Sequence, residues 1–558
     1  MDIKRLLLAL ALSFVFIVTW NVFFPPLEEV QENKSPQKTQ TFQSELIQKE
    51  NKAPMIVENI QPSAAPTIIS TPLTRLQLGN GATSIQNLKI IESNSDNAYK
   101  HAGSWDQSGK NYITDAPVEL IRNATCNPCL IIDGKNIVFE KTNINQKGGL
   151  QIVESVSESE EKIIKKTIIY NDSYVIDHKF KNLPDKNIIL VWDSGLLPSE
   201  KLIKDDLSYF SVYAQNQESY EEEYLSSIDK QKSFTFDDNV GWAGLKSKYF
   251  MKAITNYDYN DLKAKKVVFN VSPAQIIDGS QTVNANMECH YSYQDLEGGN
   301  LELSSYMGPI DLKYLNQEKN KHLSQLFGFG WFFIGYLGKA VMWLLTTLYS
   351  VIPNYGVVCI LFAFIIRFFT GPLTKKSFLS NQKMQAIQPK LKKIQDKYKD
   401  DSAKLNQEIM GLYQKEGVNP LGGCLPILIQ MPLLIALFQV FRKTIEFRGA
   451  PFLPFWITDL SQPDVILQFD FLKNIWGINY FFGHGIALLP IIMGVVMFLN
   501  MRMTATANIN PSQTSTMYIM NGFFILLFNT FPSGLNLYYT VYNILNFLQQ
   551  RKLQKINS

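Results

Sequence analysis

Apolar residues are distributed unevenly along this chain. Residues 27–320 mix polar positions with short strand-like runs, whereas residues 323–550 carry long runs rich in Phe, Leu and Ile. The mean hydropathy of −0.06 averages over these two halves and conceals the difference between them. The pattern predicts two structural classes in one chain: a polar part built from strands and an apolar part built from helices.

The start of the chain predicts an uncleaved membrane anchor over residues 1–24. Lys4 and Arg5 precede an apolar run over residues 6–24, which at 1.5 Å per residue nearly spans a bilayer core of about 30 Å. A cleaved signal peptide is the alternative, but the small residues of a cleavage site are missing before Pro25. Residues 25–66 are rich in Gln, Glu, Lys, Ser, Thr and Pro and predict a disordered linker.

Residues 67–320 predict an all-β domain. The segment KTIIYNDSYVIDHKF (166–180) has two β-rich runs around a turn, and NIILVWD (187–193), KSFTFDD (232–238) and KKVVFNVSP (265–273) repeat the style. The sequence shows neither a nucleotide-binding loop nor a nucleophile elbow. His178 and His290 leave open a sugar-processing β-sandwich, but lone histidines on strands are more often merely solvated. We therefore expect no enzymatic activity.

Two further features bear on ligands. Cys126 and Cys129 form a CxxC pair, which leaves open a zinc half-site, a redox pair, a small-loop disulfide or two idle thiols. No second CxxC or His pair supports zinc, so we expect no metal and no cofactor. The net charge of +3 is too small to indicate a nucleic-acid partner.

The apolar half predicts an interfacial amphipathic helix followed by five membrane spans. The helix is expected within residues 321–355, where Gly, Lys and Pro interrupt the apolar pattern. The FPSG segment at 531–534 predicts a tight turn between the last two spans, which are short. The expected spans are 356–373, 421–441, 485–501, 517–531 and 535–548, the last four lying within 418–550.

Charge sets the expected orientation. Residues 374–417 hold ten Lys or Arg against five Asp or Glu, and the tail 551–558 has three basic residues and no acidic one. By the positive-inside rule both segments are cytoplasmic, so both termini are inside and residues 25–330 are periplasmic. We expect Gly371-Pro372 to end the helix before the cytoplasmic segment.

The cytoplasmic segment 374–417 predicts a helical hairpin. Apolar residues recur at helical spacing on both sides of Asp400-Asp401-Ser402, which supplies a turn and an N-cap. These apolar residues form one seam along the two predicted helices. The seam fits two interpretations equally: a docking arm for a partner or nascent chain, or a self-packed, solvated hairpin. The seam residues are Ile387, Leu391, Ile394, Tyr398, Leu405, Ile409 and Leu412.

The run FAFIIRFFTGPLTKK (362–376) places Arg367 inside an apolar span, at a cost of about 2.5–3.5 kcal/mol on insertion scales. Counted at about 1.5 Å per residue from the cytoplasmic edge of the membrane, Arg367 and Asn543 lie at a depth of roughly 12 Å and Gln430 at about 13 Å. No Asp or Glu lies in these spans. A hydrated pocket for a transient polar or acidic visitor is one interpretation. An arginine satisfied by Gln430, Asn543 and backbone carbonyls for packing alone is the other.

Three motifs resemble the YidC/Oxa family of membrane protein insertases: RFFTGPLTK at 367–375, NPLGGCLPILIQMP at 419–432 and FPSGLNLYY at 531–539. Weaker similarities are VGWAGLKSKYF (240–250) and MGPIDLKYL (307–315). The resemblance implies a polytopic α-helical membrane protein with six transmembrane helices, five forming the insertase core. It also implies a large periplasmic β-supersandwich domain, similar in fold to sugar mutarotases but without their activity.

The resemblance also implies a function. Family members insert and help to fold inner-membrane proteins, alone or beside the Sec translocon, without ATP or a cofactor. Arg367 matches the arginine of a groove open to the cytoplasm and to lipid, Gln430 lies in a matching motif, and Asn543 joins the groove by its depth. Tyr538 and Tyr539 match positions near the substrate helix. Implied partners are nascent membrane proteins, Sec translocon components, the ribosome transiently and the lipid bilayer.

The chain departs from the family pattern in three places. Loop 442–483 is longer than expected, and the tail after Leu548 is too short for the long basic extension that binds ribosomes in some members. Tyr542 stands where a small polar residue is expected, which predicts a narrower lower groove. Tyr538 and Tyr539 also have a plainer interpretation, helix packing or an interfacial aromatic belt.

Two other classes of protein are alternatives to an insertase. A solute transporter would show internal repeats, which this sequence lacks. An envelope scaffold would leave Arg367 without a role.

Overall fold

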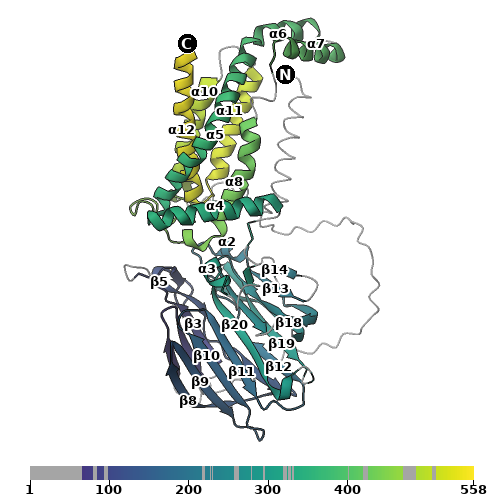
Figure 1. Cartoon of the computed structure of the whole chain (residues 1–558), viewed down its shortest axis with the longest axis vertical. Coiled ribbons are helices and arrows are strands. Elements are labelled where there is room, and N and C mark those ends of the chain that lie inside the picture. Colours follow the sequence, from purple (N-terminus) through teal and green to yellow (C-terminus); the bar gives the residue numbers. More distant parts are fainter. Residues whose placement is uncertain are drawn as a thin grey trace. The chain divides into compact units, whose positions relative to one another are not determined.

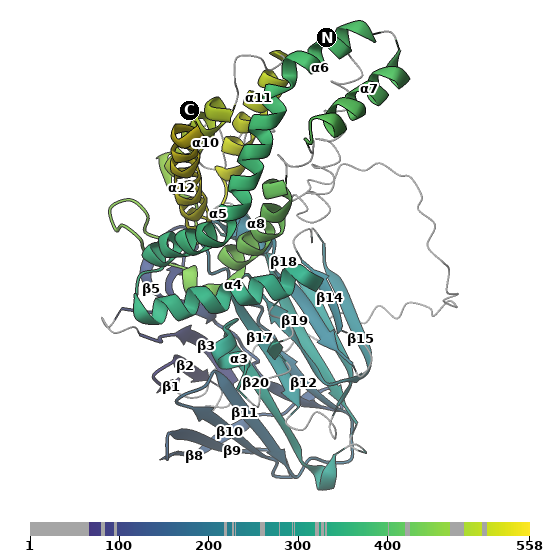
Figure 2. The same ribbon diagram turned by 45° about the horizontal axis from the view of Figure 1, so that its top comes forward.

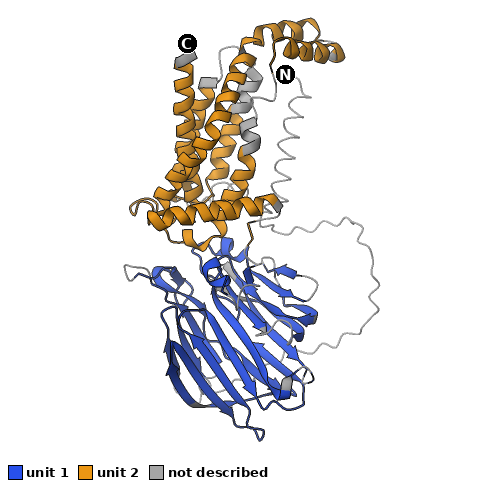
Figure 3. Ribbon diagram, viewed as in Figure 1, with its two compact units in different colours: residues 1–324 blue, residues 325–558 orange. Residues whose placement is uncertain are grey.

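The computed structural model divides into two compact units, residues 1–324 and residues 325–558 (Figure 3). The predicted anchor 1–24 and all but the last residue of the linker 25–66 lie outside the described residues. The structure describes residues 66–79, 84–93, 98–216, 220–225, 228, 230–256, 263–277, 280–292, 294, 296–317, 323–324, 328–329, 332–399, 401–418, 425–468, 485–504 and 511–557.

The first unit is a β-domain with three antiparallel sheets (Figure 1). Their strand orders are β1-β2-β3-β5-β4, β14-β13-β16-β17-β20-β11-β10-β9-β8 and β15-β18-β19-β12-β6-β7. The strands are β1 Thr67–Ser70, β2 Thr74–Gly79, β3 Ser84–Ile90, β4 Ala102–Trp105, β5 Tyr112–Ile121, β6 Cys129–Ile132, β7 Lys135–Asn136, β8 Phe139–Lys147, β9 Leu150–Ser157, β10 Ile164–Tyr170, β11 Val175–Lys181, β12 Ile188–Trp192, β13 Ser211–Gln215, β14 Tyr220–Tyr224, β15 Lys232–Val240, β16 Trp242–Lys246, β17 Phe250–Asn256, β18 Ala264–Ile277, β19 Ser280–Tyr291 and β20 Leu301–Pro309. Two short helices, α2 Ile203–Leu207 and α3 Leu312–Leu315, complete the unit.

The strands predicted from sequence are confirmed. The two runs of the 166–180 segment form the antiparallel pair β10 and β11, with Thr167 opposite His178. Residues 187–193, 232–238 and 265–273 overlap β12, β15 and β18. Cys126 and Cys129 are joined by a disulfide, which selects one of the interpretations left open by the CxxC pair.

Two buried lysines connect the nine-stranded and six-stranded sheets. Lys165 on β10 donates to the backbone oxygen of Pro128, just before β6, at 3.1 Å. Lys252 on β17 donates to the backbone oxygen of Ser194, just after β12, at 2.5 Å. Burial lowers the pKa of each lysine to about 7. The same inward face carries His178, whose pKa burial and the Lys165 charge hold well below its usual range.

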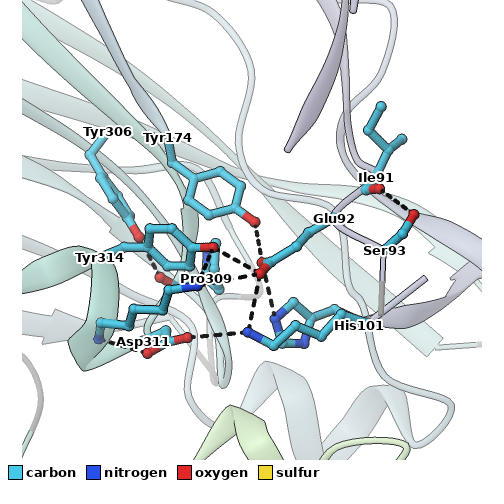
Figure 4. Close-up of polar contacts among 11 residues, drawn as sticks. Ile91, Glu92, Ser93, His101, Tyr174, Tyr306, Pro309, Asp311 and Tyr314 are labelled. Atoms are coloured by element: carbon cyan, nitrogen blue, oxygen red, sulfur yellow. Dashed lines mark hydrogen bonds and ion pairs between the residues drawn. The ribbon is translucent and has the colours of Figure 1, made fainter. Parts of the chain in front are cut away.

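A cluster of polar side chains around Glu92 connects three segments of the β-domain (Figure 4). Its carboxylate accepts hydrogen bonds from the hydroxyls of Tyr174 at 2.9 Å and Tyr314 at 2.8 Å. Lys100 bridges Glu92 at 3.3 Å and Asp311, the N-cap of α3, at 3.6 Å. Because these residues come from the β3–β4 connection, the start of β11 and α3, one carboxylate joins three segments distant in sequence.

Replacing Glu92 with Gln is expected to lower the free energy of unfolding by about 2 kcal/mol, because two hydroxyls lose a charged acceptor in a largely buried site. Thermal unfolding of the full-length protein in detergent measures this change. Glu302→Gln is the matched control, because its pair with Lys179 is partly exposed and is expected to contribute less than about 1 kcal/mol. An equal loss in both variants would show that the Glu92 cluster adds nothing particular.

The second unit is helical. Helix α12 packs on α5 and α10, α4 packs on α8, and α10 packs on α11. Figure 2 shows α6 and α7 as an arm beyond one end of α5, while α4 lies across the other end of the bundle. The helices are α4 Phe332–Val351, α5 Tyr355–Ala386, α6 Gln388–Lys397, α7 Ser402–Lys415, α8 Leu425–Lys443, α10 Leu488–Thr504, α11 Pro511–Phe528 and α12 Ser533–Asn557, with short strands β21 Val465–Gln468 and β22 Gly485–Ala487.

Among the described residues, one helical stretch, Tyr355–Met384 in α5, is long and apolar enough to cross a membrane by length and composition. Shorter apolar stretches occupy Leu488–Arg502 in α10 and Tyr518–Phe528 in α11. Helix α11 begins before the predicted run 517–531 and ends three residues before its last residue, whereas α12 extends beyond the predicted run 535–548 at both ends.

The expectation that Gly371-Pro372 ends the helix was wrong, since α5 continues to Ala386. Pro372 lacks the backbone N–H that would donate to the oxygen of Phe368, a loss that helices within membranes tolerate. Beside the proline, the Thr374 hydroxyl donates to the oxygen of Thr370 at 3.0 Å. Gln549 on α12 donates to the oxygen of Gly371 at 3.2 Å.

The predicted helical hairpin is confirmed as α6 and α7. Asp401 caps α7 by accepting a hydrogen bond from the backbone amide of Lys404 at 3.0 Å. Leu391 of the seam is buried and Ile387 lies buried just before α6. Exposed Lys390 pairs with Glu416 at 2.7 Å across the hairpin, so the two helices contact each other as a self-packed arm.

The predicted turn between the last two helices is confirmed, and the loop after α8 is hydrogen-bonded to it. The amides of Ser533 and Gly534 donate to the oxygens of Gln462 and Leu460 at 2.8 and 3.0 Å. A Cβ on Gly534 would lie 2.7 Å from the Phe441 ring, so the turn needs glycine to approach α8. These contacts fix the ends of α8 and α12 on the side away from α6 and α7.

Candidate functional site

Arg367 lies on α5 inside its apolar stretch and is 7% exposed. Around it on the same helix, Phe364, Phe368 and Phe369 are exposed, as expected for a surface that faces lipid. The guanidinium therefore points away from that surface, toward the interface between α5 and α12. A cation in this position persists in membrane helices when polar groups or water surround it.

Three neutral side chains surround the guanidinium. Its Nη1 donates to the Thr374 hydroxyl at 3.3 Å, and its Nη2 donates to the Gln549 side-chain oxygen. The Tyr542 ring centre lies 5.5 Å from the guanidinium carbon, a cation–π distance. The Tyr542 hydroxyl is 3.2 Å from that of Thr370. Helices α5 and α12 thus build the cluster together.

No carboxylate balances this cation within the helices that surround it. The sequences of α5, α8, α10, α11 and α12 contain no Asp or Glu. Within the described residues, Arg367 Nε has no hydrogen-bond partner although it is buried. A buried donor without an acceptor is costly, so the site retains unused capacity for an anionic or polar visitor.

Gln430 and Asn543, predicted to share one level with Arg367, both hydrogen-bond to Tyr539. Gln430 on α8 donates to the Tyr539 hydroxyl at 3.2 Å, and Asn543 donates to the Tyr539 backbone oxygen at 2.8 Å. Asn500 on α10 donates to the Asn543 oxygen at 3.3 Å. None of the contacts of Arg367 described above is with Gln430 or Asn543. The membrane depths predicted from the sequence refer to Cα positions. The long Arg367 side chain extends along α5, so its guanidinium lies beside Thr374.

Tyr538 and Tyr539 are both buried, at 0% and 7% exposed. The Tyr538 ring packs 5.3 Å from that of Phe362 on α5, and the Tyr539 ring packs 5.6 Å from that of Phe528 on α11. In this conformation both tyrosines contribute to helix packing, the plainer interpretation of the sequence. Contact with a substrate helix would require these rings to become accessible.

Sequence reasoning missed Thr370, Thr374 and Gln549. A periodicity signal existed, because Arg367, Thr370 and Thr374 recur at helical spacing on one face of α5. Gln549 follows Tyr542 by two helical turns on α12. Because the helix was expected to end at Pro372, Thr374 was not counted as part of the face that carries Arg367.

Two family models match the chain. The "60Kd inner membrane protein" family matches residues 347–558, and the "YidC periplasmic domain" family matches residues 136–344. The first match covers Arg367 and the residues that contact it, and the second covers most strands of the two larger sheets. Together they describe the helical unit and most of the β-domain.

Curated relatives carry the name "Membrane protein insertase YidC". The protein from Prosthecochloris aestuarii is 34% identical over 415 residues, which covers 72% of this chain and 67% of the relative. The protein from Chloroherpeton thalassium is 34% identical over 382 residues, covering 65% of this chain and 60% of the relative. The alignments thus span about two thirds of the relatives' length.

A solved structure described as "Active YidC insertase crystal structure with the first transmembrane domain resolved" aligns over 88% of this chain and 94% of that chain. Its sequence identity is 16% and its TM-score is 0.34.

Proposed function

Because this chain belongs to the YidC family of membrane protein insertases, we propose that it inserts nascent proteins into the bacterial inner membrane through the groove around Arg367. A hydrophilic segment of the substrate enters the groove from the cytoplasm while its apolar helix moves along α12 into lipid. The buried, uncompensated guanidinium carries this proposal, because it offers charge-assisted hydrogen bonds to a polar segment that leaves water. Gln430 and Asn543 supply further polar groups in the same groove.

The proposed topology has six membrane spans. These are the anchor at 1–24 and the spans carried by α5, α8, α10, α11 and α12, with both termini in the cytoplasm and the β-domain in the periplasm. Helix α4 lies at the membrane interface, because Phe333, Tyr336 and Trp343 are exposed along one side of it. The basic α6–α7 arm and the basic end of α12 face the cytoplasm.

The proposed partners are nascent membrane proteins and the lipid bilayer. The Sec translocon and, transiently, the ribosome are further proposed partners. The protein also helps inserted helices to fold, as a chaperone. No ATP or cofactor takes part, because the apolar substrate helix supplies the driving force as it enters lipid. The groove lowers the cost of moving the attached polar segment.

Site-specific photo-crosslinking tests the proposal. Because Tyr539 is buried, the probe is placed at Ile544, which is exposed on α12, and a short membrane protein is stalled during synthesis. A crosslink is expected only while the substrate's apolar segment emerges from the ribosome. Ile519, exposed on α11, is the control position and is expected to crosslink less. Equal crosslinking at both positions at every chain length would contradict the route along α12.

A further inference from the structure

The connection that follows α8 begins with a turn, residues 450–460, which carries Phe455 at its tip. The Phe455 side chain is 85% exposed, the largest value among the large apolar side chains that the structure describes. We propose that Phe455 seats this turn in the periplasmic leaflet of the bilayer, at the boundary between headgroups and acyl chains. The proposed seat is a membrane contact separate from Arg367 and from α4. It depends on the proposed topology and not on insertion itself.

Backbone hydrogen bonds hold the turn in one shape. The amide of Phe452 donates to the oxygen of Ile457 at 3.0 Å, and the amide of Ile457 donates to the oxygen of Leu453 at 2.8 Å. Pro454 fixes its own φ immediately before Phe455. Because the backbone is already ordered, little conformational entropy is lost when the exposed ring leaves water.

The turn is fixed to the ends of three helices. It follows the end of α8 in the chain. A Cβ on Gly356, at the start of α5, would lie 2.2 Å from the Phe452 ring, so the turn approaches α5 closely. The oxygen of Leu460 accepts from the amide of Gly534, at the start of α12, at 3.0 Å. In the proposed topology all three helix ends lie at the periplasmic face, which places the turn at the level of the headgroups.

The chemistry of the tip fits lipid better than a protein partner. Residues 449–458 contain no Asp, Glu, Lys or Arg, so the tip offers a partner no ion pair, whereas aromatic rings are enriched at the edges of a bilayer. Trp456 lies half-buried beside Phe455. Val351, at the end of α4, is also exposed, so the apolar surface of the proposed interfacial helix continues toward the start of α5 and the turn that packs there.

Photo-crosslinking identifies what covers Phe455. The full-length protein carries p-benzoylphenylalanine in place of Phe455 in inner-membrane vesicles, and the adducts are identified by mass after irradiation. The yield of phospholipid adduct is expected to approach that of the same probe at Phe364, which is exposed on α5. Ile68 is exposed on β1 of the β-domain and is the matched apolar control. The yield at Phe455 is expected to exceed that at Ile68 by about 10- to 150-fold, the factor that burial of one phenylalanine side chain corresponds to.

Substitutions test whether Phe455 itself seats the turn. The probe is moved to Pro454, which is exposed beside it. Phe455→Asp is expected to lower the phospholipid adduct at this probe by at least about 10-fold, because it removes the buried ring and adds a charge. Phe455→Trp keeps an interfacial aromatic ring and is expected to leave the yield unchanged. Thr458→Asp, on the same turn, is the control and is expected to change the yield less than about twofold.

Several results would overturn the proposed seat. An adduct with another protein would make the turn a protein-docking surface, and an adduct with the chain's own β-domain would make it a contact within the molecule. A phospholipid yield no higher than at Ile68 would leave the ring in water. Crosslinking at Ile544 tests insertion separately, so each of these results leaves the proposed function standing. A missing phospholipid adduct at Phe364 as well would contradict the proposed topology together with the seat.

Discussion

Arg367→Ala is expected to reduce insertion of a test protein with one aspartate in its translocated segment by roughly 10- to 100-fold, since a hydrogen bond to a charged group contributes about 1.5–3 kcal/mol. The guanidinium is buried and surrounded by neutral groups, and Arg367 is the one charged residue of α5 between Tyr355 and Thr374, so its replacement removes the formal charge from this part of the helix. Protease protection of the substrate in vesicles that contain the purified full-length protein measures the loss.

The controls separate charge from structure. Arg367→Lys keeps the charge but not the forked geometry that reaches Thr374 and Gln549, so it is expected to restore insertion only in part. Arg502→Ala removes an exposed arginine near the end of α10 and is expected to change insertion less than about twofold, as typical of surface substitutions. Comparable losses in the Arg367→Ala and Arg502→Ala variants would point to general basic charge instead of the groove.

Lys165→Met is expected to raise the free energy of unfolding of the β-domain by about 3–5 kcal/mol near neutral pH. Burial lowers the pKa of Lys165 from an ordinary value of 10.5 to about 7, and one pKa unit corresponds to about 1.4 kcal/mol. Methionine fills a similar volume without a charge, and replacing buried ionic groups by apolar ones often stabilises a protein. The lost hydrogen bond to Pro128 reduces the gain by about 1 kcal/mol.

The direction of the Lys165 pKa shift determines how the stability of the β-domain changes with pH. Between the folded pKa of about 7 and the unfolded value of 10.5, the unfolded state binds a proton at Lys165 that the folded state does not. Wild-type stability therefore rises with pH across this window, and below about pH 7 the penalty is fully present. The advantage of Lys165→Met is expected to shrink by about 3 kcal/mol between about pH 6.5 and about pH 9.5.

Hydrogen–deuterium exchange of the β10 and β11 amides in the full-length protein, over a denaturant series, measures this stability locally. Lys166→Met is the matched control, because Lys166 is the next residue of β10 and forms a partly exposed pair with Glu154. Its effect is expected to stay within about 1 kcal/mol and to lack the pH dependence. A pH-independent gain in Lys165→Met would show that Lys165 is charged in the folded domain.

Much of this architecture was predictable from sequence because it depends on local patterns. Runs of β-favouring residues around turn residues predicted β10, β11, β12, β15 and β18, and helical spacing with the Asp401 cap predicted the α6–α7 hairpin. The motifs around Arg367 and in the FPSG turn were sufficient to recognise the family. The anchor at 1–24 remains a prediction, since it lies outside the described residues.

The contacts of the groove were not predictable in the same way. Arg367 was identified as an uncompensated cation because the sequence contains no acidic residue in the spans. Its partners were missed because Gln549 is 182 positions away along the chain, and no local pattern records which faces of α5 and α12 meet. Gln549 also donates to the oxygen of Gly371 beside Pro372, and this contact between two helices likewise leaves no local signal in the sequence.

The sequence by itself determined the division into a β-domain and a helical unit, the hairpin arm and the unpaired positive charge, because each follows from periodicity or composition along a short stretch. Only the tertiary structure decided that Tyr542 covers Arg367, that Tyr538 and Tyr539 are buried, and that Lys165 points into the core although Lys166 beside it faces outward. These outcomes depend on which surfaces pack together, and packing joins residues whose separation along the chain leaves no local signal.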